Sequence, residues 1–250
     1  MYKGWNKSFR NKINLKIIRI SNSKYGVGGF IVNLAYYIFL LLIIFLLVLL
    51  INKNIKLSPK KIKIYITGVS FLFILRYIGL FLLCILKNGS IVYLLKPLLF
   101  LNFLAIPFMV LGLSYVYLRW DKLSFNVIYI ISAILFVAYC MGINFISGKV
   151  IFNPSYGYVI NIYNEKTIDV IFLLLVGSLL CFCFYFFDKP NNNRWGMIYL
   201  VIALVLVIVE NILYIGGIRL FPYPIFGDGI FILIMNFAIN TFKKNIRETI

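Results

Sequence analysis

The stretch GFIVNLAYYIFLLLIIFLLVLLI, residues 29–51, carries no charged residue and is long enough to cross the hydrocarbon core of a bilayer. An apolar helix needs about 20 residues to do so. Stretches of the same kind recur along the chain and fill most of it. They predict spans at Gly29–Ile51, Ile62–Leu86, Ile91–Leu118, Phe125–Ile146, Asp169–Phe187, Gly196–Gly216 and Ile225–Phe242. The sequence therefore predicts an all-α, polytopic membrane protein built as a bundle of seven transmembrane helices.

The composition agrees with this class and limits the partners. Hydrophobic residues make up 63% of the chain, and the mean hydropathy is +0.98. The runs are uninterrupted, so they lack the alternation of a membrane β-barrel. The net charge of +18 lies in tails and loops beside the spans. There it sets topology and meets anionic lipid headgroups, and no folded basic face is expected for nucleic acid.

The predicted organisation is simple. Residues 1–27 form a basic tail, residues 28–243 the transmembrane domain, and residues 244–250 a short basic cytosolic tail, with no soluble domain attached. The chain contains no histidine, and its four cysteines all lie inside spans. No span carries paired carboxylates, and no metalloprotease, nucleophile-elbow or phosphate-loop pattern is present. We therefore expect no catalytic site, no metal and no cofactor.

The basic residues of the loops predict the orientation. One face, with the loops after spans one, three and five and the C-terminal end, carries twelve of them. These are Lys53, Lys56, Lys60, Lys61, Lys63, Arg119, Lys122, Lys189, Arg194, Lys243, Lys244 and Arg247. The loops of the other face carry only Lys87, Lys149, Lys166 and Arg219. By the positive-inside rule the first face is cytosolic. The basic N-terminal tail opposes this orientation, and we weight the loops more because their charges are spread over independent segments.

Charge inside a predicted span is costly and marks functional candidates, and three such residues merit weighing. Arg76, Lys96 and Glu210 all lie in the half of the bundle next to the outer face. We expect Glu210 to face the interior and to lie near Arg76 or Lys96. The alternative is that these charges only lock helices together or extend to the interface.

Further polar groups complete the predicted site. Asn102 adds an amide at similar depth, and the loops around Tyr156 and Asp228 are predicted to roof the cavity. Those loops, Ser147–Ile168 and Arg219–Gly229, are expected to be non-helical. With two basic groups against one carboxylate, the cavity suits a small anionic or carbonyl-bearing ligand. A kink at Pro107 in the third span is expected to shape packing.

The seven spans, the outer loop between the fourth and fifth of them and the closing run of the chain together resemble a known family. The run NILYIGG (211–217), then FPYPIF (221–226) and GIFILIMNFAINTFKKNIRETI (229–250), looks like the last two helices of the seven-helix sensory region of membrane histidine kinases. The third span, KPLLFLNFLAIPFMVLGLSYVYL (96–118), is similar to that region's third helix, and Tyr156-Gly157-Tyr158 sits where the family has a Gly-aromatic motif. The resemblance implies a sensory role, without the kinase domain.

Two classes of function follow. The first is a receptor-like sensor in the cell membrane that perceives an extracellular or membrane-borne ligand and relays the signal to a separate partner. The partners considered are a histidine kinase or other signalling protein and a second copy of the chain. The alternative is a small transporter or a membrane-embedded accessory of an export or cell-envelope system.

Overall fold

The computed structural model describes residues 34–86, 89–118, 124–153, 156–189 and 192–247. The predicted basic tail, 1–27, and the beginning of the first predicted span, up to residue 33, lie outside these residues, as does the end of the chain from residue 248.

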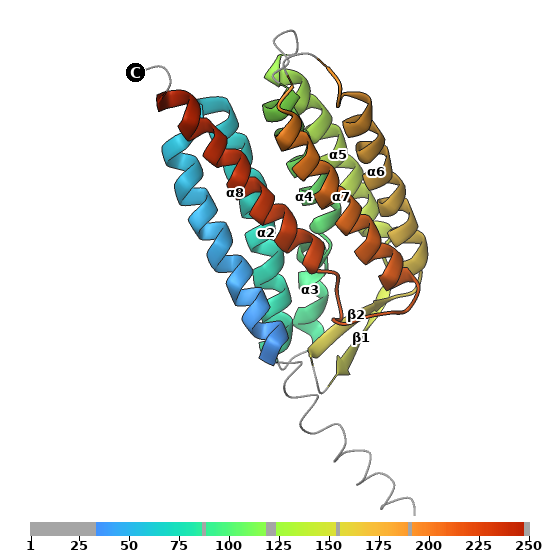
Figure 1. Ribbon diagram of the computed structural model, residues 1–250. Coiled ribbons are helices and arrows are strands. Elements are labelled where there is room, and N and C mark those ends of the chain that lie inside the picture. The colour runs from blue at the N-terminus through green and yellow to red at the C-terminus, as the bar shows by residue number, and fades with distance from the viewer. Residues whose placement is uncertain (1–33, 87–88, 119–123, 154–155, 190–191, 248–250) are drawn as a thin grey trace, which may run out of the picture.

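The described chain is a bundle of long helices with a small hairpin at one end (Figure 1). The first helix is Leu34–Leu57. The other elements are α2 (Lys60–Ile85), α3 (Gly89–Leu99), α4 (Asn102–Leu118), α5 (Phe125–Phe145), β1 (Gly148–Asn153), β2 (Gly157–Ile162), α6 (Glu165–Tyr185), α7 (Arg194–Ile215) and α8 (Phe226–Arg247). We call the end with the strands the hairpin end.

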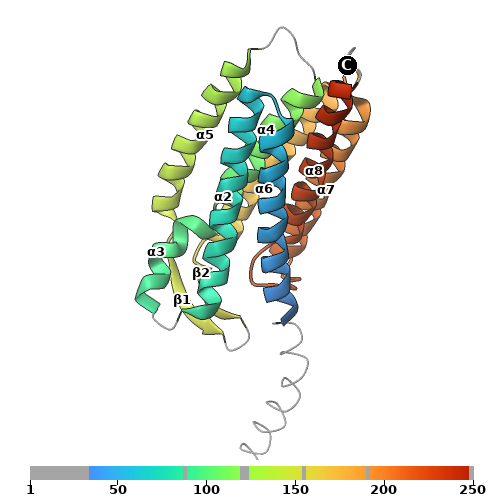
Figure 2. The same ribbon diagram turned by 90° about the vertical axis from the view of Figure 1, so that its left-hand side faces the viewer.

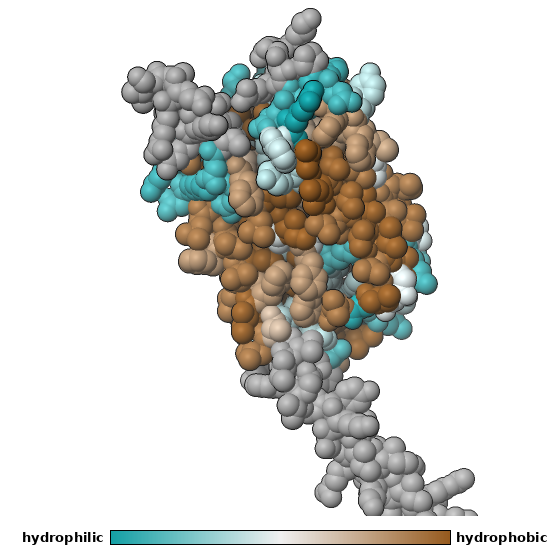
Figure 3. All heavy atoms as spheres, viewed as in Figure 1, coloured by the Kyte–Doolittle hydropathy of each residue, from teal (hydrophilic) through white to brown (hydrophobic). Residues whose placement is uncertain are grey.

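Six of the described helices are long and apolar enough to cross a membrane. These are Leu34–Leu57, Lys60–Ile85, Ile91–Leu118 (α3 and α4 counted together), Phe125–Phe145, Glu165–Tyr185 and Arg194–Ile215. The seventh predicted span falls on α8, where the apolar part covers Phe226–Asn240 and is shorter. Figure 3 shows hydrophobic residues over the middle of the bundle and hydrophilic ones gathered toward its ends.

The third predicted span, Ile91–Leu118, is interrupted. Phe100 and Leu101 separate α3 from α4, and Figure 2 shows α3 turning away from the line of α4. At this break the Leu101 amide donates to the carbonyl three residues back, that of Leu98, at 3.4 Å. The interruption is not at Pro107, where the sequence predicted a kink, because Pro107 lies inside α4.

The predicted loop between the fourth and fifth spans contains a two-stranded antiparallel hairpin, which departs from the all-α expectation. Its register pairs Gly148 with Ile162 and Asn153 with Gly157. Gly157 has a φ of +78°, a conformation that glycine adopts without a steric penalty. A Cβ there would also lie 2.6 Å from the Leu83 carbonyl oxygen, so the turn rests directly on the end of α2.

The core lies where α2, α4, α7 and α8 meet. Phe73 and Leu80 of α2, Val110 of α4, Leu204 of α7 and Ile232 of α8 are fully buried there. The outward faces of the helices are also apolar, as lipid-facing surfaces are. Exposed examples include Phe45, Leu94, Ile134, Leu174 and Val209.

Candidate functional site

A fully buried ion pair joins α2 to α8 near the hairpin end. Arg76 of α2 is 1% exposed, and its guanidinium pairs with Asp228 in the first turn of α8. The Tyr77 hydroxyl donates a 2.9 Å hydrogen bond to the same carboxylate. Because both charges are removed from water, losing one partner leaves the other unpaired in apolar surroundings. We call Arg76, Tyr77 and Asp228 the latch.

Arg76 also donates to two carbonyls outside the latch. Its Nε lies 3.2 Å from the carbonyl oxygen of Leu99, the last residue of α3. Its Nη2 lies 2.8 Å from that of Pro224, in the connection between α7 and α8. One side chain therefore holds α2, α3, α8 and the α7–α8 loop together.

The break in the third span supplies one of these carbonyls. In a continuous helix the Leu99 oxygen would accept from the amide of Phe103. Here that amide donates to the Phe100 carbonyl at 3.1 Å instead. The freed Leu99 oxygen accepts from Arg76, and the carbonyl of Pro97 accepts from the Tyr139 hydroxyl of α5. The interruption is thus compensated by side chains, as broken helices in apolar surroundings require.

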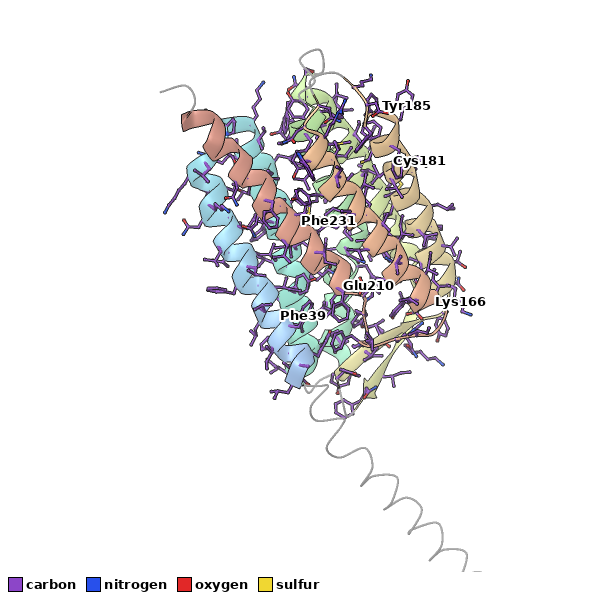
Figure 4. All side chains as sticks on the ribbon, viewed as in Figure 1. Phe39, Lys166, Cys181, Tyr185, Glu210 and Phe231 are labelled. Atoms are coloured by element: carbon purple, nitrogen blue, oxygen red, sulfur yellow. The ribbon has the colours of Figure 1, made fainter. Side chains whose placement is uncertain are left out.

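Glu210 caps α8 rather than pairing with a cation. Its carboxylate, on α7, accepts backbone hydrogen bonds from Ile225 (2.9 Å), Phe226 (3.0 Å) and Gly227 (2.7 Å). These are amides at the start of α8, which have no partner within that helix, and a negative charge is favourable there. Figure 4 shows Glu210 beside the beginning of α8. The predicted pairing with Arg76 or Lys96 is therefore corrected, since the partner of Arg76 is Asp228.

The two remaining predicted wall residues differ in position. Asn102 is buried at the first position of α4 and lines the same small cavity as Arg76. Lys96 lies half-buried in the last turn of α3. Among the residues that the structure describes, Lys96 forms no ion pair with Glu210 or any other carboxylate.

A second ion pair lies nearer the surface of the hairpin end. Arg219 donates to Glu165, at the start of α6, at 2.7 Å. The Tyr214 hydroxyl donates to the same carboxylate at 2.9 Å and lies below the Arg219 guanidinium, 4.1 Å from the ring centroid. Burial opposes the charge of Arg219, but the hydrogen bond and charge of Glu165 outweigh it and raise the pKa of Arg219. This pair links α6 to the α7–α8 loop.

Aromatic residues close the hairpin end. The Ile160 amide of β2 donates to the Tyr223 hydroxyl at 3.0 Å, and the Tyr156 hydroxyl donates to the Leu220 carbonyl at 3.3 Å. The Tyr156 ring also packs on Tyr36 of the first helix, with centroids 5.6 Å apart. We call the hairpin with residues 216–225 the cap. The latch, Glu210 and the Arg219–Glu165 pair all contact the cap, and we call them the charged layer. Of the two residues predicted in the roof, Tyr156 lies in the cap, whereas Asp228 lies in the first turn of α8 and belongs to the latch.

The predicted wall residues are divided among separate cavities. Glu210 lines a cavity of about 230 Å³ between α7, α8 and the cap. Tyr156 lines another of about 220 Å³ between the hairpin and the α7–α8 loop, beside Arg219. Arg76 and Asn102 line a third of about 20 Å³, close to the room that one water molecule needs. The predicted wall residues thus line separate small spaces instead of one open positive pocket, and Arg76 is neutralised by Asp228.

Sequence reasoning missed several members of this layer. Glu165 and Tyr214 join the cap to α6 and α7, Tyr223 joins the α7–α8 loop to the hairpin, and none of the three was singled out. One feature of the sequence could have predicted the ion pairs. Asp228 and Glu165 lie in the first turns of apolar helices, so each could pair with an arginine at the same end of the bundle.

Comparison of the chain with protein-family models and with curated proteins finds no match. The function is therefore argued from the geometry alone.

Proposed function

We propose that this chain is a multi-pass protein of the cell membrane with seven spans, acting as a receptor-like sensor. The cap faces the outside and perceives a ligand, and α8 passes the change to a signalling partner on the cytosolic side. The six long apolar helices support the membrane location, and α8 is taken as the seventh span. The basic residues at the end opposite the cap support the orientation.

The observation that carries the sensory role is the connection between the cap and α8. Asp228 in the first turn of α8 is held by Arg76, and Glu210 accepts the amides that open the same helix. Arg76 also holds Pro224 of the cap. A ligand that moves the cap therefore changes the contacts that position the start of α8. Because a helix transmits displacement along its length, its far end moves as well.

The cap cavities are the proposed ligand site. The larger one is mainly apolar, with Leu213, Phe221 and Phe226 around Glu210. The neighbouring one presents Arg219, whose side chain is 36% exposed, and Tyr156. A small ligand with an apolar body and an anionic or carbonyl group suits these walls.

The core below the charged layer favours sensing over transport. Between the latch and the opposite end, the interior is filled by buried apolar residues such as Leu104, Met109, Leu113, Leu200 and Met235. A transport path needs polar groups or water through the midplane of the bundle. Among the described residues, the buried charged side chains, Arg76, Asp169 and Asp228, are instead confined to one end.

The proposal is tested by asking whether the latch controls α8. Spin labels are placed at Phe237→Cys on α8 and Leu49→Cys on the first helix, both exposed positions, after the four cysteines are replaced by alanine. Pulsed electron paramagnetic resonance in lipid nanodiscs then gives the distance distribution between them. Asp228→Asn is expected to shift or broaden this distribution.

Asp188→Asn is the matched control, because it makes the same chemical change at an exposed position outside the cap, the latch and α8. It is expected to leave the distribution as in the parent protein. A distribution unchanged by Asp228→Asn would contradict the relay and leave the latch as a structural pair only.

A further inference from the structure

The smallest cavity below the cap contains a carboxylate that neither ion pair includes. Its volume is about 20 Å³, close to the room that one water molecule needs. Its charged lining residues are Arg76, Glu165 and Asp169. The first two are paired with Asp228 and Arg219. The third is Asp169, which lies on α6 one turn after Glu165.

Asp169 is buried in a way that an ionised carboxylate does not tolerate. The residue is 7% exposed, and its Oδ2 atom is buried without a hydrogen-bond partner in the part of the chain that the structure describes. A buried charge is strongly unfavourable unless it is paired and hydrogen-bonded. Two states relieve this cost, because the carboxylate can gain a counter-charge or bind a proton.

The charged groups around Asp169 are already committed to other partners. On its own helix, Glu165 adds a like charge one turn away. Arg219 acts on Asp169 from the α7–α8 loop, but its guanidinium donates to Glu165 at 2.7 Å. Across the cavity, Arg76 of α2 is paired with Asp228. Two arginines thus stand against three carboxylates, which leaves one negative charge in excess.

The other polar lining residues are uncharged and belong to other elements. Asn102 lies at the start of α4, Tyr214 on α7 and Tyr223 in the α7–α8 loop, and both tyrosine hydroxyls already form hydrogen bonds. A hard metal cation takes about six oxygen ligands. Arg76 in the same wall would also repel a cation. A proton needs only the carboxylate itself, so it is the positive charge that this cavity accommodates.

We infer that Asp169 is a proton-binding site and that the arrangement described here is its protonated form. The proton is taken up from the aqueous phase on the cap side. A neutral acid removes the excess charge and can donate its hydrogen to a water in the cavity. Loss of the proton would place a second carboxylate beside Arg219, in competition with Glu165, and would loosen α6 from the cap. The inference does not rest on the sensory role, because it concerns the charge of α6 and not the cap ligand.

Infrared spectroscopy of the full chain in lipid nanodiscs reads the protonation state directly, since a protonated acid has a carbonyl band apart from those of ionised carboxylates. The chain has seven acidic residues, of which four are aspartates, so carbon-13 labelling of aspartate separates the two types. At neutral pH we expect a protonated-aspartate band in the parent protein. The band should be lost in Asp169→Asn and kept in Asp188→Asn, the exposed control. A parent protein without this band, or a band that survives Asp169→Asn, would overturn the inference.

Thermal unfolding at neutral pH gives an independent comparison of two buried aspartates. Asp169→Asn exchanges a neutral acid for a neutral amide of the same shape and should move the thermal midpoint by less than about 2 °C. Asp228→Asn removes the ionised partner of Arg76 and should lower it by more than about 6 °C. Equal losses would show that Asp169 is ionised and paired. If Asp169→Asn fails to fold, Asp169→Leu removes the acid at similar volume and assigns the infrared band.

Raising the pH tests the link to the cap. The aspartate band of the parent protein should disappear as the acid ionises. At that pH the amides of residues 218–220 should exchange about fivefold faster in the parent protein than in Asp169→Asn, which cannot ionise. Comparing the two proteins at one pH removes the intrinsic pH dependence of amide exchange. Equal exchange in the two would refute the competition for Arg219.

Discussion

Helices α4 and α5 are neighbours of similar apolar character, yet they occupy opposite environments. Nearly every residue of α4 is buried, whereas α5 buries Phe125, Ile128 and Ser132. Glycine shows the difference directly. A Cβ on Gly112 of α4 would lie 2.8 Å from the Tyr65 ring, but one on Gly142 of α5 meets open space.

The difference teaches that hydropathy does not separate protein-facing from lipid-facing helices. Both surroundings are apolar, so the transfer of a side chain to either is favourable. What distinguishes the inner helices α2, α4 and α8 is close packing. The outer helix α5 has open space beside Gly142 and buries fewer of its residues. Each prediction below tests one side of this contrast.

The largest effect is expected at the latch. Arg76→Ala leaves Asp228 buried and unpaired, and breaking such a pair costs about 3–5 kcal/mol in the free energy of unfolding. The measurement is denaturation in mixed micelles of a mild detergent and SDS. The double variant Arg76→Met with Asp228→Leu removes both charges and should recover most of the loss. A double variant as unstable as Arg76→Ala would show that the charges stabilise by more than their pairing.

The glycine pair tests the contrast between the inner and outer helix. Gly112→Leu forces a side chain against Tyr65, and overpacking of this kind costs about 1–3 kcal/mol. Gly142→Leu projects into open space and should change the free energy of unfolding by less than about 0.5 kcal/mol. The same micelle titration applies to both. Equal destabilisation of the two variants would erase the distinction between α4 and α5.

Removing the charge of Glu210 at the start of α8 should lower the free energy of unfolding by a smaller amount. Glu210→Gln keeps an acceptor but removes the negative charge beside three helix-opening amides. Loss of a charged cap of this kind costs about 1 kcal/mol. Amide hydrogen exchange should rise at Ile225 to Gly227 and remain unchanged in α5. Protection unchanged at those three amides would mean that the glutamate does not cap the helix in solution.

The smallest effect is expected at the outer ion pair. Glu165→Gln breaks the partner of Arg219, but that guanidinium is 36% exposed, and pairs of this kind contribute at most about 1 kcal/mol. The thermal midpoint of unfolding should fall slightly at low salt and match the parent protein at high salt, because exposed charges are screened. If the thermal midpoint stays lowered at high salt, Glu165 stabilises the protein as a buried group and not as part of an exposed ion pair.

The spans were the predictable part of this fold. Predicted Phe125–Ile146 and observed Phe125–Phe145 differ by one residue, since an apolar run ends where polar residues begin. The break at Phe100 was not predicted, although Lys96, Pro97 and Asn102 lie close to it in the sequence. The break depends on Arg76, which lies 23 residues earlier and donates a hydrogen bond to the released carbonyl of Leu99.

The sequence predicted at which end of the bundle the charged residues lie, but it did not predict which of them form ion pairs. Depth follows from counting residues along a helix, so Arg76 and Glu210 were correctly placed at the same end. Pairing depends on how helices are rotated about their axes, and a helix that is apolar all round gives no sign of that rotation. The open positive cavity was therefore expected where the structure has Arg76 neutralised by Asp228.

The latch also carries a consequence for how the chain is made. Tyr77 and Asp228, two of its members, are separated by 151 residues, so α2 is synthesised long before α8. At a synthesis rate of about 5–20 residues per second, Asp228 is added on the order of ten seconds after Arg76. Until the start of α8 is made, α2 would hold an unpaired arginine, which is costly in apolar surroundings. The ion pair therefore forms only after that part of the chain has been synthesised.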